Sequence, residues 1–318
     1  METWIFTHGD VDGICAGAIA LAANPGAHVF FTHPYGLAGD LKEAEGADTV
    51  IICDIALSES HLGEILRRFS SITEGGELIY IDHHPLPESI SEEELPGKVI
   101  HKLDSSASEL TYTLYQSMLD PIQARTAIYG AIGDYLDGTP TIQSLLKRWD
   151  KRTLYFESGI LIQGIEGRKK DYDLKRSIIS NLAESIPPSF DRRLVELAIQ
   201  HTHLEEIAIR EIRKKVKIFG RVAYILNFPF ALGKTATYAR GLTEASVGLA
   251  GEEKKDMIDM SLRTSSPDID LNKILRSITP RLGGSGGGHP RAAGARVPKE
   301  RFMRFLEELN EKIMMVQV

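Results

Sequence analysis

Cysteine, tryptophan and long apolar runs are scarce in this chain, which has 318 residues with 2 Cys and 2 Trp. No apolar stretch approaches the roughly 20 residues that cross a bilayer, so the sequence predicts no membrane span. The chain begins directly with an apolar, strand-like segment at 4–6, so we expect no signal peptide. Cys15 and Cys53 lie within apolar segments, which favours inert packing over a disulfide or a metal ligand. We therefore expect a cytoplasmic protein.

Positive charge is scarce in the first part of the chain. Residues 1–145 hold 6 Lys and Arg against 22 Asp and Glu, whereas 146–219 hold 16 against 11 and 220–318 hold 15 against 11. This asymmetry suggests bound cations in the first part and an anionic partner contacted by the other two; a solvated surface is the alternative. The length and the charge predict three parts, of which 146–219 is a helical bundle or linker.

Three apolar strands in the first 85 residues end in acidic and imidazole side chains. They run into His8-Gly9-Asp10-Val11-Asp12-Gly13, into Asp54, and into Asp82-His83-His84-Pro85. Strands that alternate with helices predict an α/β fold with a parallel sheet and right-handed crossovers. Open sheets of this kind bind ligands at the carboxyl ends of their strands. The sequence therefore predicts a site built from these strand ends.

A metal pair would explain so many acids in one place. Unpaired carboxylates would repel one another and raise each other's pKa. A further acid, Asp134, lies in an otherwise apolar helical segment at 121–136. Carboxylates mixed with imidazoles suit Mn²⁺ or Mg²⁺, whereas a structural zinc site would use cysteine. Two such metals can activate a water and stabilise both oxygens of an in-line displacement at phosphorus.

Two other stretches can bind anions. Ser105 and Ser106 precede a helix, where they either cap it or also hold a phosphate. The run at 283–295 is too rich in glycine for a spacer within a folded region. Its backbone amides can close on an anion, and two side chains can add donors. These anion-binding candidates are Gly286, Gly287, Gly288, His289 and Arg291. A flexible linker is the alternative for this stretch.

Together these motifs resemble those of the DHH phosphoesterase superfamily, which includes RecJ exonucleases, nanoRNases and family II inorganic pyrophosphatases. The matching motifs are His8-Gly9-Asp10-Val11-Asp12-Gly13, Asp54, Asp82-His83-His84 and Asp134 in Gly-Ala-Ile-Gly-Asp. Ser261-Leu262-Arg263-Thr264 and the glycine run resemble the DHH-associated domain that follows in this superfamily. The resemblance implies a DHH catalytic domain at 1–145 and a smaller α/β substrate-binding domain at 220–318, across a cleft.

The resemblance also implies a role for each matched residue. His8 and Asp10 would hold one metal, and Asp12, His83 and Asp134 the other. Asp54 would bridge the two, and Asp82 would orient a ligand histidine. His84 would contact the scissile phosphate. Residues of the C-terminal domain would bind the substrate, namely Arg263, His289 and the glycine amides.

Two departures from the family pattern stand out. Many relatives have Asp-Thr-Gly at the fourth motif, where this chain has Asp134-Tyr135-Leu136-Asp137-Gly138, so Asp137 is an alternative ligand. The helical stretch 146–219 is unusual for nanoRNases. It is similar to an archaeal branch of DHH exonucleases that associate with the fork-processing helicase-nuclease Hef.

We expect a 3′–5′ exonuclease on single-stranded DNA or RNA, with two divalent cations. Mn²⁺ is the preferred metal, with Mg²⁺ or Co²⁺ as alternatives. A role in DNA repair, a Hef-like protein partner and a homo-oligomer are further expectations. The second hypothesis is a phosphatase or phosphodiesterase on small nucleotides, of the pAp or cyclic dinucleotide type. The third is a catalytically silent replication or repair scaffold, which would have lost metal ligands.

Overall fold

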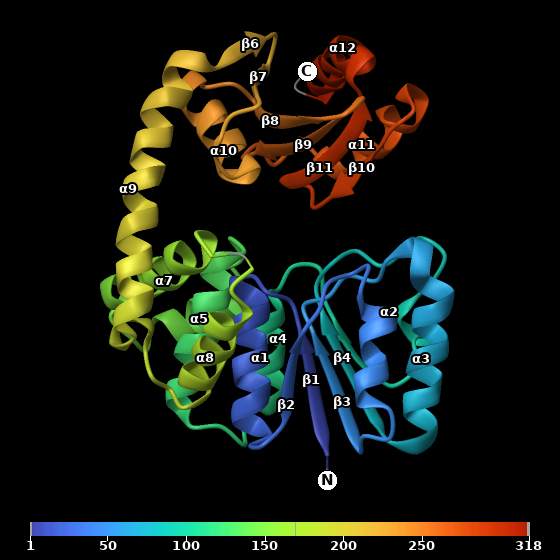
Figure 1. Cartoon of the computed structure of the whole chain (residues 1–318), viewed down its shortest axis with the longest axis vertical. Coiled ribbons are helices and arrows are strands. Elements are labelled where there is room, and N and C mark those ends of the chain that lie inside the picture. Colours follow the sequence, from blue (N-terminus) through green and yellow to red (C-terminus); the bar gives the residue numbers. More distant parts are fainter. Residues whose placement is uncertain (1, 169, 317–318) are drawn as a thin grey trace. The chain divides into compact units, whose positions relative to one another are not determined.

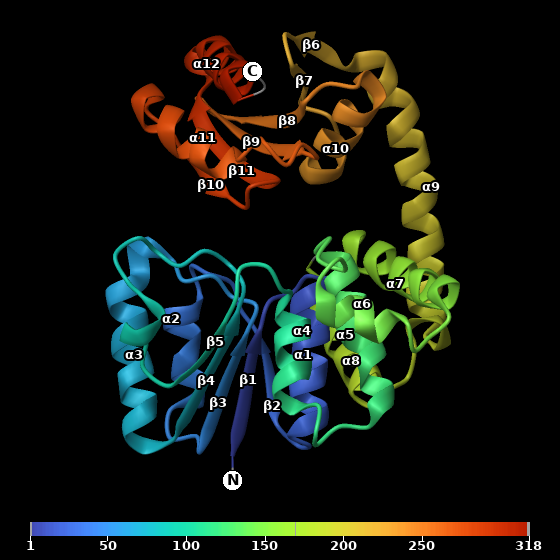
Figure 2. The same ribbon diagram turned by 180° about the vertical axis from the view of Figure 1, so that it is seen from behind.

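The computed structural model describes residues 2–168 and 170–316, which form two compact units, Met1–Thr202 and His203–Val318. Each unit contains one sheet, and the helix α9 (Arg192–Lys215) contains the boundary between them. Figures 1 and 2 show the elements of each unit from opposite sides. Each unit is described by itself below.

The first unit is built on a parallel sheet of five strands, which confirms the predicted fold class. The strands are β1 (Thr3–Thr7), β2 (His28–Phe31), β3 (Thr49–Cys53), β4 (Glu77–Asp82) and β5 (Lys98–His101). Their order is β2-β1-β3-β4-β5, and β5 was not expected from the sequence. Thr7 pairs with Cys53, and Cys53 with Ile81, so the carboxyl ends of the three central strands are level.

Alternate side chains of these strands face opposite sides of the sheet, as the two-residue period of a strand requires. Ile5, Ile51 and Ile79 pack with α1 (Val11–Ala23) and α4 (Ala107–Tyr115). Phe6, Ile52 and Tyr80 pack on the other face with α2 (Leu37–Asp40) and α3 (Leu62–Gly75). Figure 1 shows these helices flanking the sheet.

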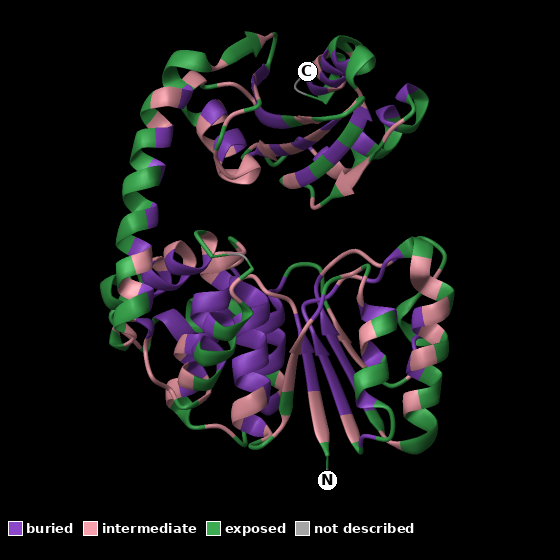
Figure 3. Cartoon of the chain, in the orientation of Figure 1, coloured by how far each residue is buried: buried purple, intermediate pink, exposed green. Residues whose placement is uncertain are grey.

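Helix α1 is buried along most of its length because it lies between the sheet and a second layer of helices (Figure 3). That layer consists of α5 (Ala124–Gly133), α6 (Pro140–Leu146), α7 (Lys151–Glu166), α8 (Tyr172–Ala183) and the start of α9. An alanine-rich helix suits this place, because small side chains allow close packing on every side. The stretch 146–219, which was expected to be helical, therefore shares a core with α1 as far as the start of α9. The boundary between the two compact units falls within α9.

The second unit contains a mixed sheet of six strands in the order β10-β11-β9-β8-β7-β6. The strands are β6 (Lys217–Phe219), β7 (Val222–Leu226), β8 (Val247–Lys254), β9 (Met257–Thr264), β10 (Ser285–Gly288) and β11 (Ala292–Pro298). Helix α10 (Leu232–Thr243) covers one face, and α11 (Leu271–Ile278) and α12 (Phe302–Val316) cover the other. Short 3₁₀ turns lie at 41–44, 59–61, 92–94, 121–123, 188–190, 280–282 and 299–301.

The prediction of a glycine-rich loop at 283–295 is wrong for most of that stretch, because β10 and the start of β11 lie within it. Ser285–Gly288 forms the edge strand β10, paired antiparallel with β11, and only 289–291 form the turn. A strand of consecutive glycines has no alternation of apolar and polar side chains, so its sequence pattern does not reveal it. Glycine fits here because the chains approach closely: a Cβ at Gly284 would lie 2.0 Å from the carbonyl oxygen of Arg296.

No helix within 2–168 and 170–316 has both the length and the apolar character needed to cross a membrane.

Candidate metal centre

The sequence-predicted residues of the first unit meet at the carboxyl edge of its sheet. His8 and Asp10 follow β1, Asp54 follows β3, and Asp82 ends β4. The neighbours of β1 are β2 on one side and β3 on the other, so the chain changes direction across the sheet here. Such a switch point is where open α/β sheets bind ligands. Asp134 is the C-cap residue that directly follows α5.

Asp54 lies at the middle of this group. Its Oδ2 is 3.8 Å from His8 Nδ1 and its Oδ1 is 3.3 Å from His83 Nε2. Both oxygens are buried, and no residue within 2–168 or 170–316 gives them a hydrogen bond. Burial, followed by the charge of Asp10, raises the pKa of Asp54 well above its usual value. Its backbone is left-handed, with a φ of 59°, which is an uncommon conformation for a residue other than glycine and is found at functional sites.

These features fit a pair of divalent cations. Among the groups of potential ligand atoms within 4.8 Å of one another, one holds His8, Asp10 and Asp54, and another holds Asp12, Asp54 and His83. Asp54 belongs to both of these groups and to a third with Asp82 and His84. Buried carboxylate oxygens normally have donors, so two without any indicate a cation ligand. Carboxylates with imidazoles suit Mn²⁺ or Mg²⁺.

Asp12 is held by the start of α4. Its carboxylate accepts hydrogen bonds from the backbone amides of Ala107 at 2.6 Å and Ser108 at 3.0 Å. Its Oδ2 also lies 3.9 Å from His83 Nε2. A Cβ at Gly130 would lie 2.6 Å from Asp12 Oδ1, so glycine in α5 leaves room for this carboxylate. Asp12 therefore faces a helix N-terminus on one side and a candidate ligand on the other.

The structure distinguishes between the two acids of the fourth motif. Asp134 Oδ2 lies 3.3 Å from His83 Nε2, whereas Asp137 accepts a hydrogen bond from Tyr155. The left-handed residue Tyr135, with a φ of 59°, lies between them. Burial, followed by the charge of Asp134, raises the pKa of Asp12 to about 7. Burial opposes protonation of His83, but the contact with Asp134 raises its pKa to about 9.

His8 and Asp10 form a close pair, with 2.7 Å between Nδ1 and Oδ2. Asp10 also accepts a hydrogen bond from the amide of Gly13 at 3.0 Å and thereby caps α1. The charge of Asp10 raises the pKa of His8. Burial acts to raise the pKa of Asp10, but the interaction with His8 lowers it. A Cβ at Gly13 would lie 2.5 Å from the carbonyl oxygen of His8, so the turn requires glycine here.

Asp82 contacts His84, the histidine for which we expect a phosphate contact. Asp82 Oδ1 lies 2.9 Å from His84 Nδ1, and Oδ2 accepts the His84 amide at 3.3 Å. Burial opposes ionisation of Asp82, but His84 lowers its pKa. Sequence reasoning missed two supports of this pair. Tyr80 OH donates to Asp82 at 2.9 Å, and His101 Nε2 lies 2.7 Å from the carbonyl oxygen of His84. Tyr80 could have been found, since residues 80 and 82 face the same side of a strand.

Of the two serines before α4, Ser106 fits the capping interpretation. Ser106 accepts a hydrogen bond from the amide of Glu109 at 3.2 Å. Both Ser105 and Ser106 are buried, and Asp12 takes the first amides of α4. As placed here, neither serine is open to a substrate phosphate, because the carboxylate occupies the position that an anion would take.

The substrate-binding candidates of the second unit gather around the turn between β10 and β11. Arg263 pairs across the sheet with Ala292, and the Thr264 amide donates to the carbonyl of Arg291 at 3.1 Å. The Arg263 guanidinium donates to Ser261 Oγ and to the Leu262 carbonyl, each at 2.9 Å. The amide of Gly288 donates to Asn272 at 3.1 Å, and its φ is 139°. His289 is half-buried in this turn, and Arg291 is exposed.

The fold and the site define an α/β protein with a buried centre of acids and histidines. Two family models match the chain: the N-terminal domain of the DHH family over residues 2–134 and the DHHA1 domain over 229–315. Together they cover more than half of the chain. The chain belongs to the DHH phosphoesterase superfamily.

Solved structures share the fold at low sequence identity. One is described as the DHH domain of a member of a family of ribosomal proteins (TM-score 0.72, 16% identity, 98% of this chain and 86% of that chain). Another is RecJ with Mn²⁺ from Thermus thermophilus (0.67, 18%, 98% and 52%). A third is a pGpG-specific phosphodiesterase from Vibrio cholerae (0.60, 12%, 99% and 99%). A comparison with curated protein sequences found no match. The family and the centre together support a metal-dependent phosphoesterase.

Proposed function

We propose that this chain is a metal-dependent phosphodiesterase that hydrolyses single-stranded DNA or RNA from the 3′ end. The observation that carries the proposal is the position of Asp54, whose two buried oxygens face two separate groups of ligand atoms. His8 and Asp10 would hold one cation with Asp54, and Asp12, His83 and Asp134 the other. When bound, two divalent cations activate a water and stabilise charge at phosphorus.

The remaining residues bind and orient. Asp82, itself held by Tyr80, fixes the Nδ1 side of His84 at 2.9 Å, so that Nε2 is the atom of this ring that would contact a phosphate oxygen. The cations Arg263 and Arg291, with His289, form the anion-binding surface of the second unit. RecJ, whose structure has Mn²⁺ bound, shares the fold and supports a nucleic-acid substrate and this metal.

The test uses DNA and RNA oligonucleotides of graded length, labelled at either end and incubated with Mn²⁺. We expect successive shortening from the 3′ end, loss of activity in EDTA and recovery when Mn²⁺ is restored. Asp82→Ala combined with His83→Ala should abolish hydrolysis while circular dichroism stays native. Retained activity in this variant, or full activity in excess EDTA, would overturn the proposal.

A second candidate is a phosphodiesterase of small nucleotides. The chain and the pGpG-specific phosphodiesterase match over 99% of both lengths, whereas this chain spans 52% of RecJ. Length dependence distinguishes the two candidates. An enzyme of small nucleotides would cleave a dinucleotide at least as well as a 12-mer, and an exonuclease would prefer the longer chain.

A further inference from the structure

A surface hollow of about 770 Å³ lies where α7 meets α8 in the first unit. Three cations, Arg168, Lys170 and Arg176, and the aromatic ring of Tyr172 line it. All four residues are exposed, Tyr172 to 45%. Exposed aromatic rings among cations are the feature by which proteins bind single-stranded nucleic acid, because bases stack on the rings and phosphates meet the charges.

Tyr172 places this hollow beside the carboxyl edge of the sheet. Its ring packs against Phe31, the last residue of β2, with 5.6 Å between the ring centroids. The Nζ atom of Lys175 lies 5.2 Å from the same ring, in a cation–π contact. The contacts with Phe31 and Lys175 therefore hold the Tyr172 ring in place, and its exposed part can stack on a base.

Lys175 links the hollow to the metal centre. It is a buried lysine of α8, only 4% exposed, which is rare for this residue type. A Cβ at Gly9 would lie 2.8 Å from Lys175 Nζ, and Gly9 separates the candidate ligands His8 and Asp10. One side chain thus contacts both Tyr172 and the first ligand loop.

Three acids, Glu166, Asp171 and Asp173, line the hollow beside its three cations, and two of these acids bind arginines. Asp171 caps α8 by accepting the Leu174 amide at 3.1 Å, and its carboxylate also binds Arg193 at 2.7 Å. Asp173 pairs with Arg176 at 2.9 Å in an exposed pair, which is a weak interaction that a phosphate can displace.

We propose that this hollow binds the polynucleotide strand next to the phosphate held at the metal centre, with a base stacked on Tyr172. The inference rests on the proposed phosphodiester hydrolysis and favours its nucleic-acid substrate over the small nucleotides of the second candidate. It also gives a function to the helical segment, which the family motifs leave without one. Successive phosphates lie near Arg176, Arg168 and Lys170.

The first test compares Tyr172→Ala with Phe156→Ala in the full chain with Mn²⁺. Phe156 is an exposed aromatic residue of α7 outside the hollow, at 64% exposure. We expect Tyr172→Ala to lower the ratio of kcat/KM for a 12-mer over that for a dinucleotide about fivefold or more, through KM of the 12-mer. Tyr172→Phe should restore the ratio. An unchanged ratio, or the same loss in Phe156→Ala, would overturn the inference.

A binding measurement tests this inference independently of the proposed function. If the wild-type chain hydrolyses neither substrate, the proposed function fails. Fluorescence anisotropy of a labelled 12-mer in EDTA then still shows whether the hollow binds a nucleic-acid strand. Tighter binding by the wild type than by Tyr172→Ala, about fivefold, supports the hollow. Equal affinity overturns it.

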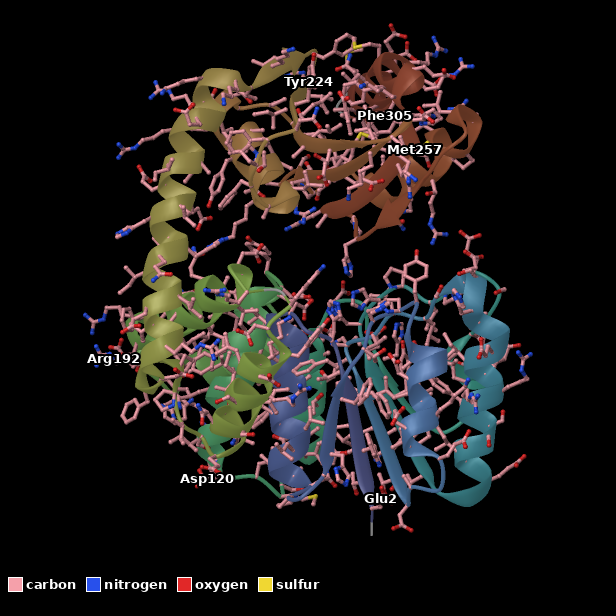
Figure 4. All side chains as sticks on the ribbon, viewed as in Figure 1. Glu2, Asp120, Arg192, Tyr224, Met257 and Phe305 are labelled. Atoms are coloured by element: carbon pink, nitrogen blue, oxygen red, sulfur yellow. The ribbon has the colours of Figure 1, made fainter. Side chains whose placement is uncertain are left out.

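The salt dependence of binding tests the phosphate contacts. Arg176→Gln should reduce the slope of log Kd against log salt by about 0.7, the value for one phosphate of a single strand. Arg192→Gln is the matched control, because Arg192 begins α9 with its side chain in solvent (Figure 4) and binds Glu196 at 3.0 Å. Equal slopes in wild type, Arg176→Gln and Arg192→Gln would contradict a phosphate contact at Arg176.

Discussion

The carboxyl edge of the parallel sheet and the β10–β11 turn both present charged side chains and histidine, but they differ in burial. Asp12 and Asp54 are 0% and 2% exposed, whereas Arg291 is exposed and His289 half-buried. Burying a carboxylate without a cation costs stability, and an exposed arginine costs almost none. The edge is thus costly to fold and suited to holding metals, while the turn can bind and release an anion.

Asp54 gives the largest expected effect on activity. Asp54→Asn keeps the shape, and asparagine tolerates the left-handed backbone. We expect hydrolysis to fall roughly 10³-fold, which corresponds to the several kcal/mol that a metal contributes at phosphorus. A folded-state pKa above the unfolded value means that the charged form of Asp54 destabilises the metal-free chain at neutral pH. The variant's metal-free Tm should therefore rise, as calorimetry in EDTA would show. A lower Tm would contradict this reading of Asp54.

Asp12 is expected to stabilise the metal-free chain, whereas Asp54 destabilises it, although both belong to the same centre. Asp12→Ala removes the acceptor of two backbone amides at the start of α4, at a cost of about 1–3 kcal/mol. Denaturant unfolding in EDTA measures this loss, and Asp12→Asn, which keeps one acceptor oxygen, should lose less. If Asp12→Ala were as stable as the wild type, the contacts with α4 would contribute nothing.

The turn of the second unit should affect binding and leave the metals in place. His289→Ala removes one donor to a substrate anion, so we expect KM to rise about 20-fold, within the range for hydrogen bonds to charged groups. Mn²⁺ affinity, measured by titration calorimetry, should stay within about twofold of the wild type, since this half-buried side chain is replaced without altering the buried carboxylates. His203→Ala, an exposed histidine of α9, is the control. Loss of Mn²⁺ in His289→Ala would show that the turn belongs to the metal centre.

The pH dependence of metal binding should be the smallest effect. The pKa of Asp12 is raised to about 7, so its carboxylate is protonated at lower pH and must release a proton to bind a cation. Mn²⁺ affinity should therefore fall as the pH is lowered below about 9, where His83 gains a proton, and more steeply below pH 7, by up to about tenfold for each pH unit and proton displaced. Calorimetric titrations at pH 6, 7 and 8 measure this fall. A constant affinity would contradict the raised pKa.

Local sequence patterns predicted more of the first unit than of the second. Apolar strands that end in His8, Asp54 and Asp82 are visible along the chain, because both the strand and its polar end are local features. The edge strand β10 was not visible, since its glycines lack a side-chain period, and β8 and α10 were also missed. The sequence left open whether the serines before α4 only cap the helix or also hold a phosphate, because the carboxylate that occupies this helix end comes from Asp12, about 95 positions earlier.

The chemistry of the centre follows from local sequence patterns: which carboxylates and imidazoles are available, at the ends of which strands, and in which superfamily. Which of these side chains meet depends on the tertiary structure. It placed Asp134 and not Asp137 beside His83, left the oxygens of Asp54 without donors among the described residues, and brought Lys175 from α8 against Gly9. These are contacts between distant segments, fixed by helix packing and strand register. A one-dimensional pattern therefore contains the ligands but not their geometry.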